Sequence, residues 1–340
     1  MSDSTCFIGL DYHQGSVQVC ALESDGTVIS NRRVANDWHA IVGAAPSGRP
    51  IAAAIEAGTG AADLGDQLTD LAGWDVSLAH AQYVAKLKQS PDKSDFSDAR
   101  LLGDLTRVGY LPRTWRPPQR TRELRRVSRH RHELADQRRA VKLRIQAIRR
   151  DHRLGRPPAN PWTRRWLHWL RHHEALPESS RWLLEEHLDD LDRVQKKIAR
   201  AEEKLEAMTA GDALVEQLKR LPGIGPVTAY TLAAEIGRFD RFRTAKQLCR
   251  YCGLSPRNAS SGEKRADAGL IRAADPKLRA LLIQAAHRLA RTHRRWRAMA
   301  GQLRGRGKPA TVAVAAVANR WMRWLYHQVV TNHAEPAATA

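Results

Sequence analysis

The sequence predicts an α/β domain at the N-terminus, followed by a long helical coiled-coil hairpin and an all-α C-terminal domain. Three observations predict this order. Short apolar runs separated by turn residues fill the first third of the chain, as strands do. Two long stretches after about residue 112 carry apolar residues at near-heptad spacing, which is typical of paired helices. A Gly-Ile-Gly turn then opens the last region. We therefore expect domains at 1–111, 112–210 and 211–340.

The first domain begins with three short strands, expected at 5–10, 16–22 and 27–34 and separated by turn residues. Asp11 stands at the end of the first strand. Three antiparallel strands with an acid at this place are typical of a ribonuclease H-like fold.

The next elements predict that the sheet is mixed. Residues 51–55 form a continuous apolar run that ends in Glu56, which suits a strand buried on both faces. A helix is expected at 61–71 and a further strand at 74–79. Strand, helix and strand form a crossover unit, so these two strands should run parallel.

Two more acids, Asp95 and Asp98, lie three residues apart at the start of a predicted helix and therefore share one of its faces. Each acid alone has an ordinary explanation as a helix cap, a turn cap or a solvated strand end. Together with Asp11 and Glu56 they predict four carboxylates that converge on one point. Mg²⁺ or Mn²⁺ would neutralise such a set, because both ions prefer hard oxygen ligands. Two such ions support phosphodiester displacement.

The charge of the chain is segregated along the sequence. Lys and Arg number 56 against 36 Asp and Glu, a formal net charge of +20. Residues 1–110 hold 8 basic and 14 acidic residues, a net charge of −6, which leaves +26 for the remainder. An Arg-rich excess of this size indicates a polyanion partner. Nucleic acid is favoured over a membrane, because no lipid-facing apolar stripe accompanies the charge.

The second region should form two long helices. One apolar stripe passes through Leu124, Val127, Leu134, Val141, Ile145 and Ile148, and the other through Leu184, Leu188, Leu191, Ile198 and Leu205. Prolines and glycines between the stripes predict an antiparallel hairpin. Trp162, Trp166 and Trp169 at its tip either stack on bases or anchor the tip, with packing favoured. The hairpin suits dimerisation and nucleic-acid binding equally.

The third region opens on Gly223-Ile224-Gly225, which predicts a helix-hairpin-helix, because glycines permit the tight turn and the next helix N-terminus can hold a phosphate. An ordinary helix-helix turn is the alternative. Farther along, a Ser-Ser-Gly loop at 260–262 is uninformative by itself. Cys249 and Cys252 have no second pair at zinc spacing, so no zinc site is expected. The absence of a signal peptide and of a membrane-spanning run predicts a cytoplasmic protein.

With these motifs in place, almost the whole chain resembles the transposases of insertion sequences that join a RuvC-like DEDD domain to a C-terminal domain with a catalytic serine, also described as bridge-RNA-guided recombinases. The resemblance rests on five motifs: Gly9-Leu10-Asp11, Glu56 to Gly60, Lys93-Ser94-Asp95 to Asp98-Ala99-Arg100, Leu221 to Pro226, and Gly253-Leu254-Ser255-Pro256 leading to Ser261-Gly262. It departs from the family after the serine, where Arg272 and Ala274 replace the usual Lys and Gly.

The resemblance implies a site and partners. Asp11, Glu56, Asp95 and Asp98 would bind the metal, and Ser261, or else Ser260, would attack DNA. The implied partners are donor and target DNA, a guide (bridge) RNA and further copies of the chain in a dimer or tetramer. The protein would be associated with the bacterial nucleoid. Expected nucleic-acid contacts are Gly223, Gly225, Arg257, Lys264, Arg265 and Arg272.

Two other functions compete with this interpretation. A metal-dependent junction-resolving nuclease would use water and leave Ser261 idle. A nucleic-acid-binding scaffold would use the hairpin and the Gly-Ile-Gly turn, with the acids merely structural.

Overall fold

The computed structural model describes residues 5–88, 94–258, 267–271 and 274–331. The chain divides into two compact units, Met1–Gln119 and Arg120–Ala340. The further division at about residue 210 stays a prediction.

The first unit is built on a six-stranded sheet with the order β3-β2-β1-β4-β5-β6. β1 pairs antiparallel with β2 and parallel with β4, and β5 is parallel to β4, so the sheet is mixed as predicted. The strands are β1 Cys6–Tyr12, β2 Ser16–Leu22, β3 Val28–Ala35, β4 Ile51–Glu56, β5 Asp75–Ala79 and β6 Arg113–Thr114.

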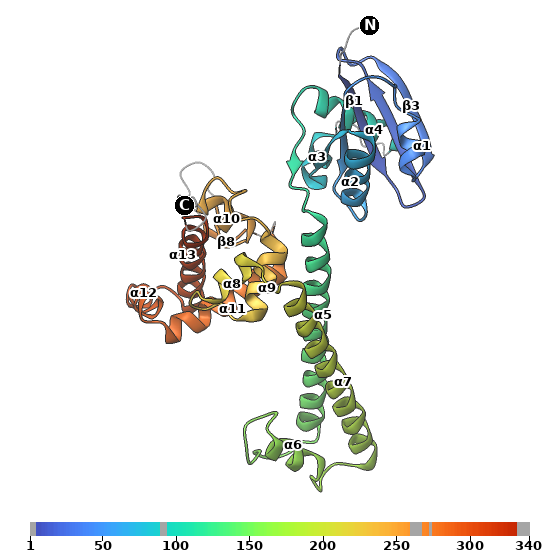
Figure 1. The fold of residues 1–340 in the computed structure, drawn as a ribbon. Coiled ribbons are helices and arrows are strands. Elements are labelled where there is room, and N and C mark those ends of the chain that lie inside the picture. Colours follow the sequence, from blue (N-terminus) through green and yellow to red (C-terminus); the bar gives the residue numbers. More distant parts are fainter. Residues whose placement is uncertain (1–4, 89–93, 259–266, 272–273, 332–340) are drawn as a thin grey trace. The chain divides into compact units, whose positions relative to one another are not determined.

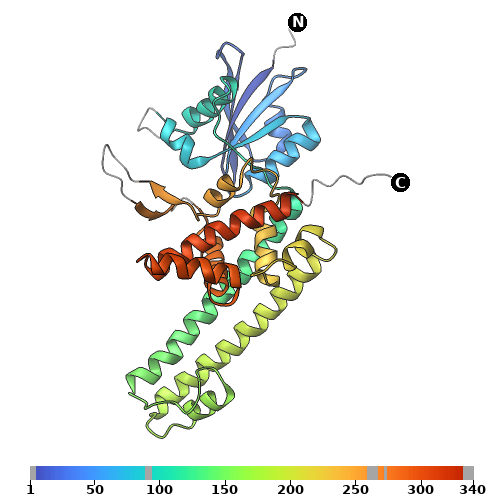
Figure 2. The same ribbon diagram turned by 90° about the vertical axis from the view of Figure 1, so that its left-hand side faces the viewer.

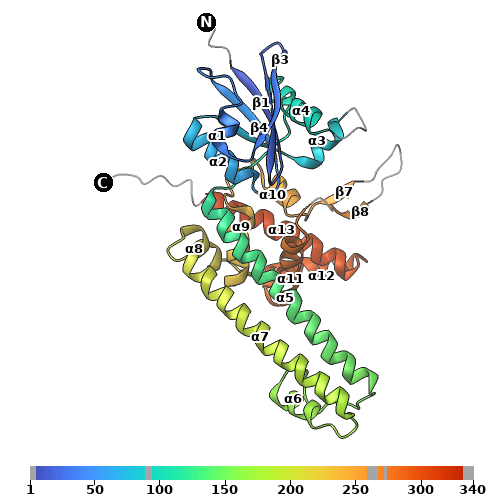
Figure 3. The same ribbon diagram turned by 90° about the vertical axis from the view of Figure 1, so that its right-hand side faces the viewer.

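Helices cover both faces of this sheet (Figures 1 and 3). They are α1 Trp38–Val42, α2 Ala61–Ala72, α3 Ala81–Leu87 and α4 Asp95–Arg107. One core lies between the sheet and α1 and α2, where Ile8, Leu10 and Ile55 pack with Leu64 and Leu68. Smaller cores lie on the other face, under α3 and α4. Because β4 is covered on both sides, its sequence reads as an unbroken apolar run.

The second unit contains the predicted hairpin, in which α5 Gln119–Asp151 and α7 Glu178–Met208 run side by side (Figure 2). Leu134 of α5 packs with Ile198 of α7. Nearer the tip, Ile145 packs with Leu184 and with α6 Arg164–Arg171. Residues of the two predicted stripes thus share apolar clusters along the hairpin, and the coiled-coil character of the pair stays a prediction.

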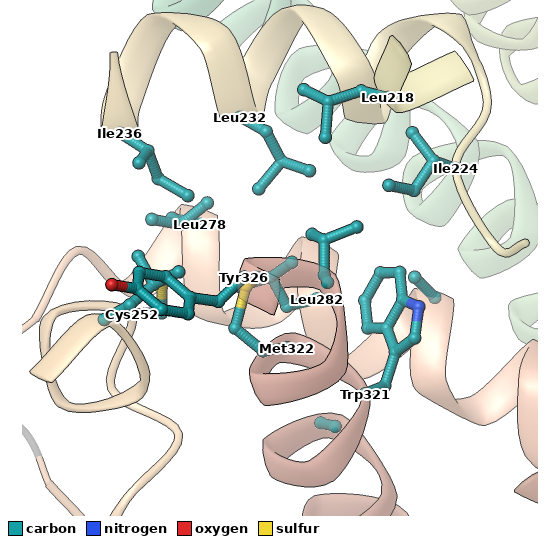
Figure 4. Packing of buried hydrophobic residues seen from close by; sticks show 14 of the residues in the cluster. Leu218, Ile224, Leu232, Ile236, Cys252, Leu278, Leu282, Trp321, Met322 and Tyr326 are labelled. Carbon is teal, nitrogen blue, oxygen red and sulfur yellow. The ribbon is translucent and has the colours of Figure 1, made fainter. Parts of the chain in front are cut away.

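The remaining helices share the largest core of the chain. Their bounds are α8 Ala213–Lys219, α9 Pro226–Ile236, α10 Ala245–Tyr251, α11 Pro276–Thr292, α12 Arg294–Gly305 and α13 Ala310–Thr331. Figure 4 shows Leu218 and Leu232 packing toward Leu282, Trp321 and Met322. No described helix is long and apolar enough to cross a membrane.

The expectation of an all-α third region is wrong, because two short strands form a ribbon. β7 Pro256–Asn258 pairs antiparallel with β8 Asp267–Leu270. Each strand is too short to show a period of two in the sequence, and turn residues surround both.

All four cysteines are buried and unpaired. Burial raises the pKa of Cys20 to about 11 and that of Cys249 to about 12, and it also raises the pKa of Cys6 and Cys252. Within the described ranges, Cys249 and Cys252 belong to no group of three metal ligands.

Candidate active site

Alternation along β1 decides which side chains face α4. Ile8 and Leu10 are fully buried in the core with α1 and α2, so Gly9 and Asp11 face the opposite side. A Cβ atom on Gly9 would overlap the backbone carbonyl oxygen of Ala99 in α4. The missing side chain therefore lets α4 lie directly against β1, with the N-terminal turn of the helix near the end of the strand.

Three side chains meet at this place. The Nε2 atom of His13 lies 3.3 Å from Oδ2 of Asp11 and 3.3 Å from Oδ1 of Asp95. One ligand atom from each residue lies within 4.8 Å of the others. Asp11 belongs to β1, His13 follows in the next turn, and Asp95 is the first residue of α4. In the part of the chain that the structure describes, no other group of three such ligands is as close.

Glu56 and Asp98 adjoin this cluster with different surroundings. In the parallel pairing of β1 and β4, the residues just before Asp11 and Glu56 are opposite each other. The two acids therefore stand at neighbouring strand ends, on the same face of the sheet. Oδ2 of Asp98 accepts a hydrogen bond of 2.6 Å from Nζ of Lys88. The structure thus brings Asp11 and Asp95 together and gives Asp98 a lysine partner.

The electrostatics of the cluster favour a cation. Burial raises the pKa of the Asp11 carboxyl, His13 lowers it, and the charges of Asp95 and Asp98 raise it further. A divalent ion would offset this repulsion and desolvation. Carboxylate oxygens suit Mg²⁺ and Mn²⁺, and imidazole is a ligand for transition metals. The residues present therefore fit a divalent metal ion.

Two members of the site were not predicted. His13 reads as a turn residue in the sequence, although it stands two places after Asp11. Lys88 lies just beyond α3 and meets Asp98 only through the tertiary fold. The position of His13 two residues after Asp11 could have indicated that it belongs to the site. The sequence around Lys88 gives no such indication.

Three of the predicted nucleic-acid contact residues, Gly223, Gly225 and Arg257, are described by the structure, and all three lie in the second unit. Gly223 has a φ of 85°, and a Cβ atom there would clash with Leu289, so the turn before α9 requires glycine. Gly225 instead has a φ of −93° as the N-cap of α9, a conformation open to any residue. Arg257 is exposed in β7.

The predicted nucleophile Ser261, its alternative Ser260 and the cations Lys264, Arg265 and Arg272 lie outside the described residues. The ribbon of β7 and β8 flanks residues 259–266, the segment that contains both serines.

Comparisons with known proteins match both units. A DEDD transposase model of the IS110 group matches residues 8–150, and a model described as "Transposase IS116/IS110/IS902 family" matches residues 215–300. The first match contains all four acids, and the second contains the Gly-Ile-Gly turn and the serine loop.

Curated relatives agree with these matches. A "Probable family 20 transposase" of Pseudomonas aeruginosa is 36% identical over 156 residues, 44% of this chain and 46% of the relative. The transposase for insertion sequence element IS1328 of Yersinia enterocolitica is 26% identical over 284 residues, 82% of each chain. The chain thus spans about half the length of the Pseudomonas relative. The two matches in this order and these relatives show that the chain is similar to transposases of the IS116/IS110/IS902 family.

Proposed function

We propose that the protein is a DNA transposase or recombinase of an insertion sequence, which cuts and rejoins DNA strands with the help of divalent metal ions. The observation that carries this proposal is the meeting of Asp11 and Asp95 at His13, at the junction of β1 and α4. The family of the chain and the +26 net charge after residue 110 support DNA as the substrate.

Asp11 and Asp95 would hold the metal, with Glu56 and Asp98 beside them. Mg²⁺ or Mn²⁺, when bound, polarises the scissile phosphate and stabilises negative charge on its oxygens. The Nε2–H group of His13 lies between the two carboxylates and would orient both by donating toward their oxygens. Lys88 holds the Asp98 carboxylate in place through its hydrogen bond of 2.6 Å.

Ser261 is the proposed nucleophile, on the strength of the family resemblance. Its hydroxyl oxygen would form a bond to the DNA phosphorus, a deoxyribose oxygen would leave, and the serine proton would pass to a base or to solvent. The same proposal includes guidance by a bridge RNA and assembly into a dimer or tetramer. Its partners are donor and target DNA. So do DNA or RNA contacts by Gly223, Gly225, Arg257, Lys264, Arg265 and Arg272.

The proposal is tested by neutralising the acids in the full-length protein. Asp11→Asn, Glu56→Gln, Asp95→Asn and Asp98→Asn should each reduce strand cleavage by at least about a hundredfold, because an amide binds divalent ions poorly. Nucleic-acid binding should stay near the wild-type level. Asp104→Asn is the matched control, since Asp104 lies on the same helix but pairs with Arg107.

Covalent trapping on DNA separates the rival functions. A serine recombinase leaves protein attached to DNA, and Ser261→Ala removes the adduct. Free ends without an adduct would favour a nuclease that uses water, and intact DNA would favour a scaffold. Full cleavage by two of the four acid variants would rule out the metal site.

A further inference from the structure

The second unit contains a groove of about 1050 Å³ between α5, α11 and the start of α9. One wall is a single face of α5, where Arg131, Arg138 and Lys142 recur at helical spacing. The other wall is a face of α11 that runs from Lys277 to Arg288. Six lining residues are Arg or Lys, and among the described residues of the lining only Asp136 is acidic.

Polar contacts hold the α5 wall against α9, whose first residues also line the groove. Arg129 of α5 donates hydrogen bonds of 2.8 and 2.9 Å to Glu235 of α9, whose exposed fraction is only 5%. His132 lies 3.0 Å from the hydroxyl of Thr231, also in α9. Because these pairs fix α9 against α5, the groove exists before any ligand arrives.

Several cations in the groove have no anion of their own. Arg138, Arg139 and Arg288 form no side-chain hydrogen bond or ion pair with any described residue. Lys142 has its pKa lowered by burial and by the neighbouring charge of Arg138. Like charges this close on the α5 wall, with Arg288 on the α11 wall, favour an anionic ligand in the groove.

The start of α9 adds backbone donors to this cationic lining. Gly225 caps the helix without a side chain, and Pro226 at the first position has no N–H. The N–H groups of Val227 and Thr228 are therefore uncapped at a helix N-terminus that lines the groove. A phosphate fits such a position, because the helix dipole and both donors favour negative charge.

An aromatic ring completes the lining. Trp162 has a φ of 72°, a left-handed conformation that is rare for a bulky side chain and tends to occur at functional sites. Its ring lies 4.9 Å from that of Trp166, which is fully buried, and 4.5 Å from Nζ of Lys142. Trp166 thus anchors the hairpin tip, whereas Trp162 presents part of its ring to the groove.

We propose that this groove binds a single-stranded segment of nucleic acid, with phosphates on the arginines and the α9 N-terminus and an unpaired base against Trp162. The inference rests on the proposed function, in which the protein handles DNA and RNA. Cations along a strand path combined with an aromatic platform are the chemistry that recognises single strands. A base inside a duplex is stacked and paired, so it cannot reach the indole.

The test measures binding of the full-length protein to labelled oligonucleotides of about 15 nucleotides, a length within the range of known single-strand sites. The probes are a thymidine strand, a uridine strand, a duplex of equal length and a polyglutamate peptide, with EDTA present so that the acidic cluster plays no part. The groove variant combines Arg138→Gln, Arg139→Gln and Arg288→Gln. The matched control combines Lys197→Gln, Arg200→Gln and Lys204→Gln, three exposed residues of α7 outside the groove.

We expect the groove variant to bind single strands more weakly than wild type. Its plot of log affinity against log salt concentration should be less steep, with the magnitude of the negative slope reduced by about 2. The control should change neither quantity by a comparable amount. Trp162→Ala should weaken single-strand binding roughly tenfold without altering the salt slope. Trp162→Phe, which keeps an aromatic ring, should restore most of the affinity.

Three results would overturn the proposal: equal losses in the groove variant and its control, tighter binding to duplex than to single strands, or equally tight binding of a polyglutamate peptide. A preference for the uridine or the thymidine strand identifies RNA or DNA as the occupant, and either one satisfies the proposal. Since metal-dependent cleavage is measured separately, a protein that binds single strands but never cuts would contradict the proposed function alone.

Discussion

Asp11 carries an energetic cost in the metal-free protein. Its pKa is raised in the folded state mainly by burial, so ionising this carboxyl costs more in the folded chain than in the unfolded one. Stability is therefore lost as the pH rises from the ordinary aspartate pKa of about 4 through the raised folded value. A bound divalent ion would reverse this effect, because it stabilises the ionised carboxylate.

This cost predicts opposite effects of one substitution on stability and on activity. In EDTA, Asp11→Asn should raise the melting temperature relative to wild type, and the difference should grow from pH 4 to pH 7. Added Mg²⁺ should raise the melting temperature of wild type but hardly that of the variant. Thermal unfolding with Asp104→Asn as control measures both effects. A variant that is less stable than wild type at pH 7 in EDTA would contradict the assignment.

The acids could be predicted from the sequence more readily than their partners. Asp11 and Glu56 each end an apolar run, and Asp95 and Asp98 share a helix face. These are local patterns, so the sequence displays them. The pairing of Asp98 with Lys88 joins the end of α3 to the first turn of α4 in the folded chain, and no local pattern specifies it.

At the scale of elements, the position of α4 depends on Gly9. We expect Gly9→Ala to lower the free energy of unfolding by about 1–3 kcal/mol or more, because a methyl group there meets backbone that cannot move aside cheaply. The same substitution should shift Asp95 away from Asp11 and raise the Mg²⁺ concentration needed for cleavage.

Urea unfolding and Mg²⁺ titration of Gly9→Ala check both effects. Gly15→Ala is the matched control, since nothing lies within 4 Å of an added Cβ atom at that position. Equal stability of the two variants would mean that α4 does not require the close approach to β1.

The elements that the sequence predicts well are those with a long regular pattern. The five main strands are apolar runs bounded by turn residues, and the two hairpin helices show a period of about 3.5 over enough residues to be recognised. The ribbon of β7 and β8 is missed because its strands have three and four residues. The two strands stabilise each other by pairing, and the sequence of either strand alone does not reveal this pairing.

At the scale of the whole molecule, the two halves of the proposed site belong to different units. Asp11 lies in Met1–Gln119, and Ser261 falls within the sequence range of the second unit. If one subunit supplies acids and another supplies the serine, a mixture of Asp11→Asn and Ser261→Ala proteins should recover some recombination. Neither parent alone should recombine above background.

Differently tagged proteins allow this complementation to be measured on assemblies that contain both variants. Covalent adducts should then form only on the subunit that retains Ser261. Mixed assemblies without recovered activity would indicate that each site is built from one subunit.

The four buried cysteines have a practical consequence for labelling. Maleimides react with thiolates, and the native thiols are both shielded and kept neutral at pH 7 by their raised pKa values. A fluorophore attached after Ala280→Cys would therefore report from the groove alone, since Ala280 is exposed on the α11 wall. The wild-type chain itself serves as the unlabelled background, and no native cysteine has to be removed from the core.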